Sequence, residues 1–167
     1  MKNKVLILTK EAIEQKIKRL SYEILEDNYE EKEIVFVGIK ENGFVFAEKI
    51  INYINSISKI STKLYSITLD KDNPLSQVIK INADSSKLNN KTIIMVDDVA
   101  NSGKTLCYAL KPILECSPKI IQIAVLVDRK HKQFPVSADY IGLSLSTTMK
   151  EHITVNFAES NEAVFLQ

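Results

Sequence analysis

The chain alternates short, continuously apolar runs with longer stretches in which apolar residues recur every three or four positions. The first pattern is typical of strands buried on both faces, and the second of amphipathic helices. Helices are predicted over residues 11–28, 44–55 and 102–115. Strands are predicted over residues 33–39, 62–69, 91–96, 120–127, 140–145 and 153–157.

The order of these elements predicts an α/β fold with a central, mainly parallel sheet flanked by helices. Residues 70–90 break the pattern, because they are polar, contain Asp-Asn-Pro and alternate only over residues 77–81. We expect them to form a β-hairpin or a mobile arm that projects from the core. Residues 158–167 are expected to form a loose tail, and the whole chain, 1–167, a single domain.

The amino-acid composition excludes few classes of protein. The 167 residues are 45% hydrophobic and 26% charged with a net charge of +1, so no overall charge indicates a nucleic-acid or membrane partner. The cysteines, Cys107 and Cys116, lack metal-ligand spacing and are expected to be free thiols. The first apolar stretch is too short for a signal peptide, and no apolar run approaches the roughly 20 residues of a membrane helix. A cytoplasmic location is therefore expected.

The sequence pattern most indicative of a binding site lies between residues 92 and 105. An apolar strand ends in Asp97 and Asp98, and a small polar turn then leads into a predicted helix. Such a turn can point successive backbone N–H groups at one anion, Gly103 lets the backbone approach closely, and the helix start adds its positive dipole end. The candidate phosphate ligands are Asn101, Ser102, Gly103, Lys104 and Thr105.

Two other interpretations compete with a sugar-phosphate site. A nucleotide-binding P-loop requires glycine five positions before Gly103, where this chain has Asp98, so it is rejected. A helix cap beside a surface charge would account for the aspartate pair alone but not for the attached Ser-Gly-Lys-Thr turn. A carboxylate pair at the carboxyl end of a strand can instead hold the 2′- and 3′-hydroxyls of a ribose and influence a nearby Mg²⁺.

This stretch closely resembles the motif with which type I phosphoribosyltransferases bind 5-phosphoribosyl-1-pyrophosphate (PRPP). Residues 126–142 are similar to those of one subgroup, the pyrimidine operon attenuation regulators, which bind RNA and often retain uracil phosphoribosyltransferase activity. The resemblance extends over nearly the whole chain to about Phe157. It implies PRPP and a nucleobase as ligands, and a homodimer. It also implies Mg²⁺ held mainly by PRPP near Asp97 and Asp98, without a direct protein ligand.

The same resemblance assigns roles to individual residues. The turn 101–105 would hold the 5′-phosphate, and Asp97 and Asp98 the ribose hydroxyls. Lys71, on an arm that closes over the reacting centre, would contact pyrophosphate. The pyrophosphate loop, which often contains a cis peptide in this family, would consist of Lys40, Glu41, Asn42 and Gly43. Residues 128–150 would form a hood and base pocket lined by Asp128, Arg129, Tyr140 through ring stacking, and Ile141 through its backbone.

Two departures from the family concern the reaction. The subgroup usually has Thr-Arg where this chain has Glu41-Asn42, which puts an anion near a polyanionic leaving group and weakens the expectation of catalysis. Purine enzymes commonly carry an aspartate as a base at the position of Asn101. An amide cannot accept that proton, so Asn101 favours a pyrimidine.

A further departure concerns RNA. The regulators' first helix usually presents a histidine and a further arginine to RNA, whereas this chain has Tyr22 and Asp27 and keeps only Arg19. RNA binding is therefore less favoured. A basic patch could still form from Lys130, His131, Lys132 and Lys150, although a solvated polar loop explains these residues equally well.

The expected function is transfer of the 5-phosphoribosyl group of PRPP to a nucleobase, most favourably uracil, with release of pyrophosphate. One alternative is a PRPP- or nucleotide-sensing RNA-binding regulator of pyrimidine genes with weak or no catalysis. A second is a purine phosphoribosyltransferase.

Overall fold

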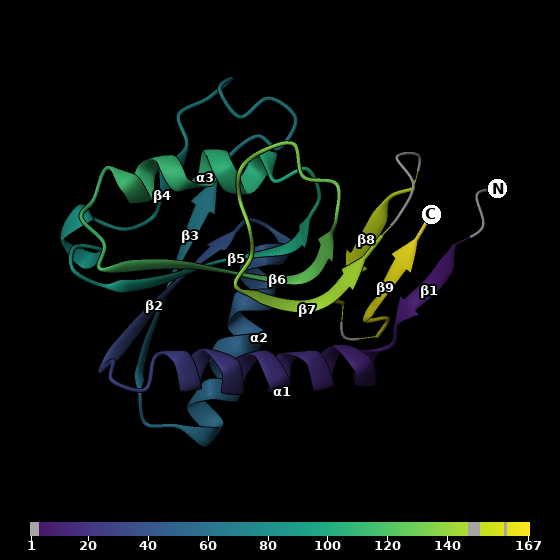
Figure 1. The fold of residues 1–167 in the computed structure, drawn as a ribbon, viewed down its shortest axis with the longest axis horizontal. Helices are drawn as coiled ribbons and strands as arrows, with labels where there is room; N and C mark the ends of the chain where they lie inside the picture. The colour runs from purple at the N-terminus through teal and green to yellow at the C-terminus, as the bar shows by residue number, and fades with distance from the viewer. Residues whose placement is uncertain (1–3, 147–150, 159) are drawn as a thin grey trace.

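The computed structural model describes residues 4–146, 151–158 and 160–167. Within these residues, a six-stranded sheet has the strand order β4-β3-β2-β5-β6-β7 (Figure 1). Its strands are β2 (Glu33–Ile39), β3 (Ser61–Thr68), β4 (Lys80–Ile81), β5 (Thr92–Ala100), β6 (Ile120–Arg129) and β7 (Tyr140–Leu145). Neighbouring strands are parallel except β3 and β4, which are antiparallel. The α/β fold with a mainly parallel sheet is confirmed.

Three helices cover the two faces of this sheet among the described residues: α1 (Lys10–Asp27), α2 (Asn42–Ile57) and α3 (Lys104–Leu114). Helices α1 and α2 lie on one face and α3 on the other (Figure 1). Alternate side chains of β2 explain the two layers, because Ile34 and Phe36 pack with α1 and α2 while Val35 and Val37 pack with α3. All four side chains are fully buried, as the continuous apolar run predicts.

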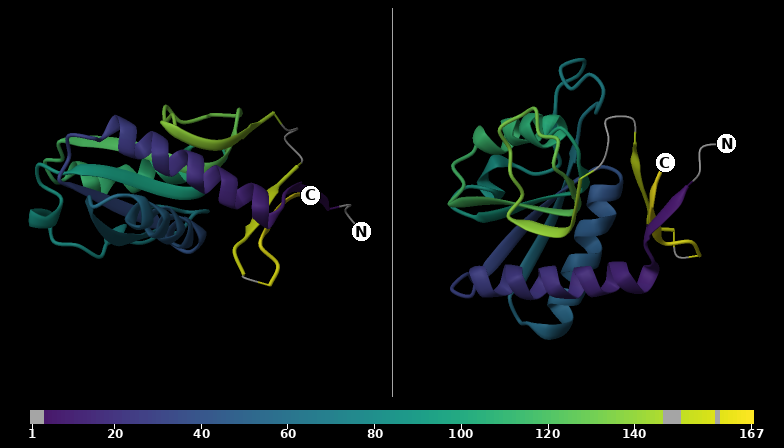
Figure 2. Two further views of the ribbon diagram at one scale, coloured as in Figure 1. Left: turned by 90° about the horizontal axis from the view of Figure 1, so that it is seen from below. Right: turned by 45° about the vertical axis from the view of Figure 1, so that its right-hand side comes forward.

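A second, three-stranded sheet joins the two ends of the chain. It consists of β1 (Val5–Leu8), β9 (Ala163–Leu166) and β8 (Ile153–Asn156), paired antiparallel in that order. Figure 2 shows it beside the main sheet, with the first and last strands of the chain in it. The prediction of a loose tail over residues 158–167 is therefore wrong. Strand β9 pairs on both sides, and Val164 is fully buried in the core.

The predicted arm, residues 70–90, begins after β3 and contains the short strand β4. Strand β4 pairs with the end of β3 through Ile67 opposite Ile81, so the segment is closed at its base like a hairpin. Residues 69–79, called the arm below, project beyond α3 as an irregular loop (Figures 1 and 2). Of the predicted hood and base pocket at 128–150, the described residues 128–146 form the end of β6, a loop and β7 of the main sheet. In the described residues, no helix is long and apolar enough to cross a membrane.

Candidate active site

Two buried carboxylates lie near the carboxyl end of β5. Strand β5 continues through Asp97 and Asp98 to Ala100, so the acid pair is part of the sheet. The exposed fraction is 1% for Asp97 and 8% for Asp98. Burial, reinforced by the charge of Asp98, raises the pKa of Asp97 from 3.8 to about 7. Water stabilises these charges poorly, so the pair suits a ligand that brings hydroxyl groups or a cation.

The arm already supplies one cation to this pair. Lys71 Nζ lies 3.3 Å from Asp97 Oδ1 and 3.9 Å from Asp98 Oδ1. A second contact holds the arm nearby, because Lys104 Nζ donates to the carbonyl of Asp72 at 2.8 Å. The arm turns at this point, where the Asp70 carboxylate accepts from the backbone N–H of Asp72 at 2.9 Å. The structure thus brings the predicted Lys71 to the acid pair.

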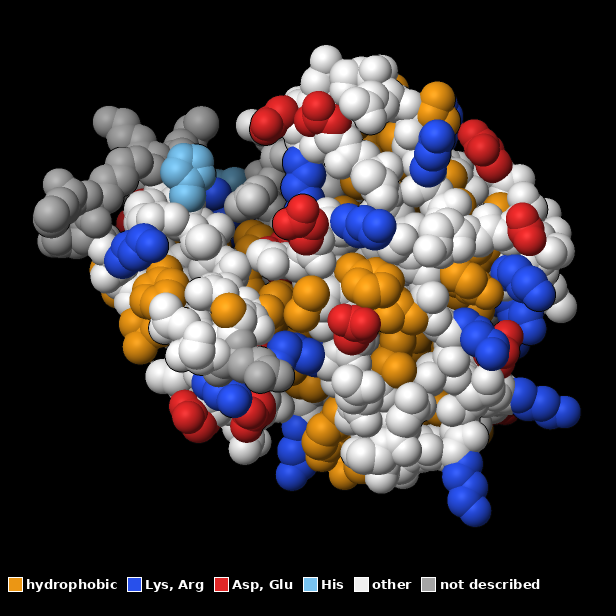
Figure 3. Space-filling model, turned by 180° about the vertical axis from the view of Figure 1, so that it is seen from behind, with side chains coloured by type: hydrophobic (Ala, Val, Ile, Leu, Met, Phe, Trp, Pro, Cys, Tyr) orange, Lys and Arg blue, Asp and Glu red, His pale blue; other side chains and the backbone are white. Residues whose placement is uncertain are grey.

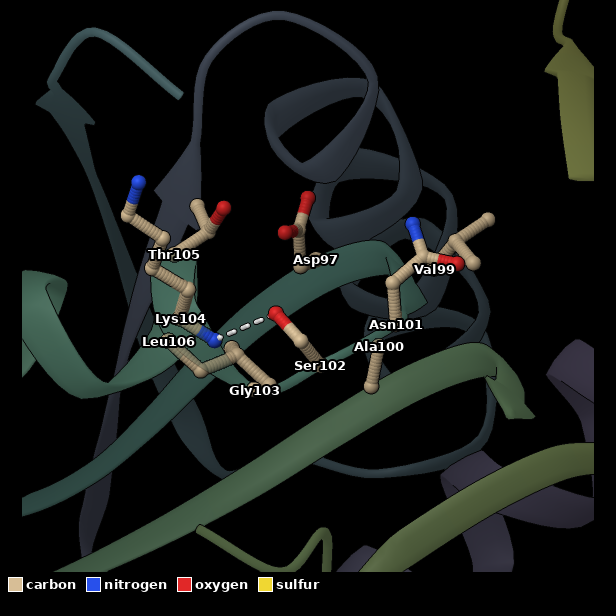
Figure 4. Close-up of a pocket in the computed structure, with 9 residues that line it drawn as sticks. All are labelled: Asp97, Val99, Ala100, Asn101, Ser102, Gly103, Lys104, Thr105 and Leu106. Carbon is tan, nitrogen blue, oxygen red and sulfur yellow. Dashed lines mark hydrogen bonds between the residues drawn. The ribbon is translucent and has the colours of Figure 1, made fainter. Parts of the chain in front are cut away.

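The predicted phosphate ligands form one continuous loop around a pocket. The pocket is lined by Asp97, Val99, Ala100, Asn101, Ser102, Gly103, Lys104, Thr105 and Leu106 (Figure 4). Gly103 has φ +82°, a left-handed conformation that favours glycine, and helix α3 begins directly after it. The hydroxyl oxygen of Ser102 accepts from the N–H of Lys104 at 3.3 Å. The positive end of α3 therefore faces the same pocket as Asp97.

The predicted pyrophosphate loop connects β2 to α2 directly beside the acid pair. The peptide bond between Lys40 and Glu41 is cis, which confirms the expected conformation. Asn42 begins α2, and its side-chain amide donates to Asp98 Oδ2 at 2.8 Å and to the carbonyl of Val155 at 3.1 Å. Asn42 thus connects the acid pair to β8 of the small sheet, a link that no sequence pattern indicated.

Gly43 allows this close approach. A Cβ atom on Gly43 would lie 2.6 Å from the carbonyl oxygen of Val96 and 2.9 Å from the Cα of Asp97. Real Cβ atoms essentially never come this close to backbone, so the start of α2 can sit against β5 only with glycine at this position. The turn 40–43 and the end of β5 consequently lie in direct contact.

The end of β6 borders the phosphate loop. Arg129 is 8% exposed, and its Nη1 donates to Asn101 Oδ1 at 3.1 Å. Asp128 pairs with Lys132, whose Nζ also donates to backbone carbonyls of the phosphate loop. Asp128 and Arg129 therefore lie near the site, as predicted, but both already have polar partners in the chain.

Tyr140 and Ile141 lie on β7, and the prediction that the ring of Tyr140 stacks on the base needs correction. They begin β7, where Tyr140 pairs with Ala124 and Ile141 with Val125. Because Val125 in turn pairs with Asp97, both residues lie two strands away from β5, at about the level of the acid pair. Tyr140 is 2% exposed in the core below α1, and its hydroxyl accepts from Asn28 Nδ2 at 3.2 Å. Burial raises the pKa of Tyr140, in keeping with this core position. The carbonyl of Ile141 accepts from Arg19 Nη2 at 2.8 Å, so its backbone is also engaged.

The basic residues considered for RNA are dispersed. Lys130 and His131 are exposed, whereas Lys132 turns inward, and Lys150 lies outside the described residues. Arg19 is engaged with Glu23 of its own helix and with the backbone of β7. On the face shown in Figure 3, Lys and Arg side chains lie among Asp and Glu side chains, with hydrophobic side chains between them. That face carries charges of both signs.

Comparison with known proteins agrees with this geometry. The family described as phosphoribosyl transferase domain matches residues 6–159. A protein of Clostridium kluyveri named bifunctional protein PyrR is 36% identical over 165 residues, covering 95% of this chain and 93% of its own length. The protein of the same name from Clostridioides difficile is 37% identical over 166 residues, covering 95% and 94%.

Solved structures show the same fold at lower identity. A hypoxanthine-guanine phosphoribosyltransferase of Bacillus anthracis superposes with a TM-score of 0.75 at 23% identity, covering 96% of this chain and 95% of that one. The hypoxanthine phosphoribosyltransferase of Trypanosoma cruzi gives a TM-score of 0.78 at 15% identity, covering 96% and 94%.

Fold, site and relatives together define a phosphoribosyltransferase. The chain belongs to the phosphoribosyl transferase domain family, of type I, as the match over residues 6–159 and the relatives above 30% identity show.

Proposed function

We propose that the chain transfers the 5-phosphoribosyl group of PRPP to uracil and releases pyrophosphate. The observation that carries this proposal is one pocket lined by both the glycine-containing phosphate loop and Asp97, a member of the buried carboxylate pair. A ribose 5-phosphate group complements this pocket: its phosphate monoester can bind the loop, and its vicinal hydroxyls can bind the two aspartates. The family membership gives the reaction class independently.

In this proposal each part of the site has one task. The loop 101–105 holds the 5′-phosphate, and Asp97 and Asp98 hold the ribose hydroxyls. The bond from C1 of the ribose to pyrophosphate breaks with its electron pair on pyrophosphate. The base nitrogen attacks the cation-like C1 and gives up its proton, for which the released pyrophosphate is an available acceptor. Lys71 and the backbone of the turn 40–43 stabilise the leaving group, and the arm excludes water. Two contacts support these roles: Lys71 of the arm pairs with Asp97, and Lys104 donates to the carbonyl of Asp72 in the arm.

The residues fit a divalent cation carried by the substrate. In the described part of the chain, no three Asp, Glu, His or Cys side chains gather as a metal-binding group, whereas two carboxylates lie beside the phosphate loop. Mg²⁺ commonly takes one or two carboxylates and fills its remaining positions with phosphate oxygens and water. PRPP would hold Mg²⁺ mainly through its own oxygens, with Asp97 and Asp98 close to the ion, which would neutralise charge on the pyrophosphate group.

The choice of uracil rests on two observations. Asn101, in the phosphate loop, is an amide and cannot act as the proton acceptor that a purine ring calls for. Its oxygen is moreover already occupied by Arg129. The relatives at 36% and 37% identity carry the PyrR name, whereas the two purine enzymes compared above share the fold at 23% and 15% identity. Homodimer assembly and a cytoplasmic location belong to the same proposal.

A coupled assay tests the substrate. The protein is incubated with PRPP, Mg²⁺ and one of uracil, hypoxanthine or guanine, and nucleotide and pyrophosphate are quantified. We expect uridine monophosphate to form fastest. Faster formation of a purine nucleotide would replace uracil with a purine, and no nucleotide from any base by folded protein would remove the proposal.

An RNA-binding role is the second candidate. The relatives are named bifunctional, which supports a function beyond one reaction, and Lys130 and His131 are exposed on the loop after β6. Electrostatic binding to phosphates weakens steeply as salt rises. Titration of a labelled RNA hairpin at low and high salt tests this role, and it is discarded if binding is negligible even at low salt.

A further inference from the structure

The phosphate loop turns its carbonyl groups towards one neighbouring segment. Lys132 Nζ donates to the carbonyls of Ala100 and Asn101, both at 3.3 Å. The carbonyl of Ser102 accepts from the backbone N–H of Gln133 at 2.9 Å and of Phe134 at 3.1 Å. Three successive carbonyls, from the last residue of β5 to Ser102 in the loop, are therefore held by residues 132–134, which belong to the loop after β6.

This arrangement fixes the direction of the loop's N–H groups. In a trans peptide, the carbonyl of one residue and the N–H of the next point in opposite directions. Holding the carbonyls of residues 100–102 against residues 132–134 therefore turns the N–H groups of Asn101, Ser102 and Gly103 to the opposite side. All three residues line the pocket that also contains Asp97 (Figure 4). Residues 132–134 thus orient the N–H groups of the loop towards the pocket, as binding of an anion requires.

The ammonium group of Lys132 is the side-chain part of this support. It also donates to the carbonyl of Arg129 at 2.8 Å and pairs with the carboxylate of Asp128, and only 25% of the side chain is exposed. Because Asp128 compensates its charge, Lys132 adds little net positive potential to the pocket. Its contacts instead fasten the end of β5 and the phosphate loop to the end of β6.

We propose that Lys132 is a positioning residue for the phosphate-binding loop. It does not contact the 5′-phosphate itself but orients the backbone N–H groups that do. The inference rests on the proposed role of the loop 101–105. Removal of the ammonium leaves the carbonyls of Ala100 and Asn101 without this donor, so the loop loses the geometry that directs its N–H groups to one anion. Affinity for the phosphorylated sugar falls, while affinity for the nucleobase is retained.

Calorimetry with ribose 5-phosphate as the probe tests this inference on the full chain. Lys132→Met is expected to weaken binding about tenfold or more, since hydrogen bonds from a charged donor to the loop are lost. Lys132→Arg, which keeps charged donors of similar reach, is expected to restore most of the affinity. Lys130→Met is the matched control, because Lys130 is exposed in the same loop, and it is expected to bind like the wild type.

Steady-state kinetics separate positioning from general damage. In Lys132→Met, KM for PRPP should rise about tenfold while KM for the nucleobase stays within about twofold. Equal losses for both substrates, or unchanged ribose 5-phosphate binding, would overturn the inference. If Lys132→Met does not fold, Lys132→Gln replaces it. Because its amide has a shorter reach, this variant should bind ribose 5-phosphate at least about threefold more weakly than the wild type, and unchanged affinity would overturn the inference.

A loop variant distinguishes failure of this inference from failure of the proposed function. Ser102→Ala removes a hydroxyl of the loop itself. Weaker ribose 5-phosphate binding by Ser102→Ala with normal binding by Lys132→Met rejects only the role of Lys132. No binding of ribose 5-phosphate by the wild type rejects the proposed function, and this inference with it.

Discussion

Lys71 Nζ lies 3.3 Å from Asp97 Oδ1, although Lys71 belongs to an arm that projects from the fold and Asp97 is buried in β5. The contact places a half-exposed cation on the carboxylate whose pKa burial raises to about 7. Because an ammonium group favours the ionised carboxylate, Lys71 opposes this rise in the pKa of Asp97. Arm position and the charge of the site are therefore coupled.

Asp97→Asn should change the pH dependence of stability. The Asp97 carboxyl ionises near pH 3.8 in the unfolded chain and near pH 7 when folded, so the folded state binds more protons between these values. The contribution of Asp97 to the free energy of unfolding is thus lost as pH rises through this window. We expect Asp97→Asn to match the wild type below about pH 4 and to be about 2–4 kcal/mol more stable above pH 7. Urea unfolding at a series of pH values measures the difference, and a constant difference contradicts the account.

Lys71→Met should impair use of PRPP. Loss of a charged hydrogen-bond donor to the reacting groups is expected to reduce kcat/KM for PRPP by about 10–100-fold. Lys80→Met is the matched control, because Lys80 is exposed in β4 at the base of the arm and should have unchanged kinetics. Similar kinetics for both variants and the wild type would show that the contact of Lys71 with the acid pair has no part in the reaction.

Glu41→Gln should strengthen binding of pyrophosphate. Glu41 follows the cis peptide in the predicted pyrophosphate loop, and removal of its charge relieves repulsion of a polyanion. A like charge about 6 Å away costs roughly 2–3 kcal/mol before screening, so we expect a several-fold gain in affinity that shrinks with added salt. Glu48→Gln, on the exposed side of α2, should leave the affinity unchanged. An equal gain in both variants would indicate a general charge effect.

Tyr140→Leu should affect stability and spare recognition of the base. Tyr140 fills the core below α1 and its hydroxyl accepts from Asn28, so the substitution is expected to cost about 2–4 kcal/mol of unfolding free energy. KM for the nucleobase, measured well below the unfolding temperature, should stay within about twofold. A large rise in that KM with normal stability would restore the stacking role.

The sequence predicted the parts of the site that are local in the chain. Residues 97–105 carry strand, acid pair, glycine turn and helix start in one stretch, and each local preference agrees with the next. The turn 40–43 was predictable from its resemblance to the family, including the cis peptide.

Contacts between distant segments were not predictable. The spacing of apolar residues indicates burial but not strand register. An aromatic residue at the start of a strand could therefore face either the core or a pocket. The pairing of Tyr140 with Ala124 places Tyr140 in the core. The small sheet pairs residues near both ends of the chain, and its short strands have no strong pattern of their own. Asn42 and Lys132 gain their roles only because β8 and the loop after β6 fold back onto the site.

The account depends most on where the phosphate of a phosphorylated sugar binds. A crystal structure of the protein with ribose 5-phosphate tests this directly. We predict the phosphate within hydrogen-bond distance of the N–H groups of residues 101–105, with the ribose hydroxyls facing Asp97 and Asp98. A ligand bound elsewhere, or an empty pocket at saturating ligand, would contradict the account.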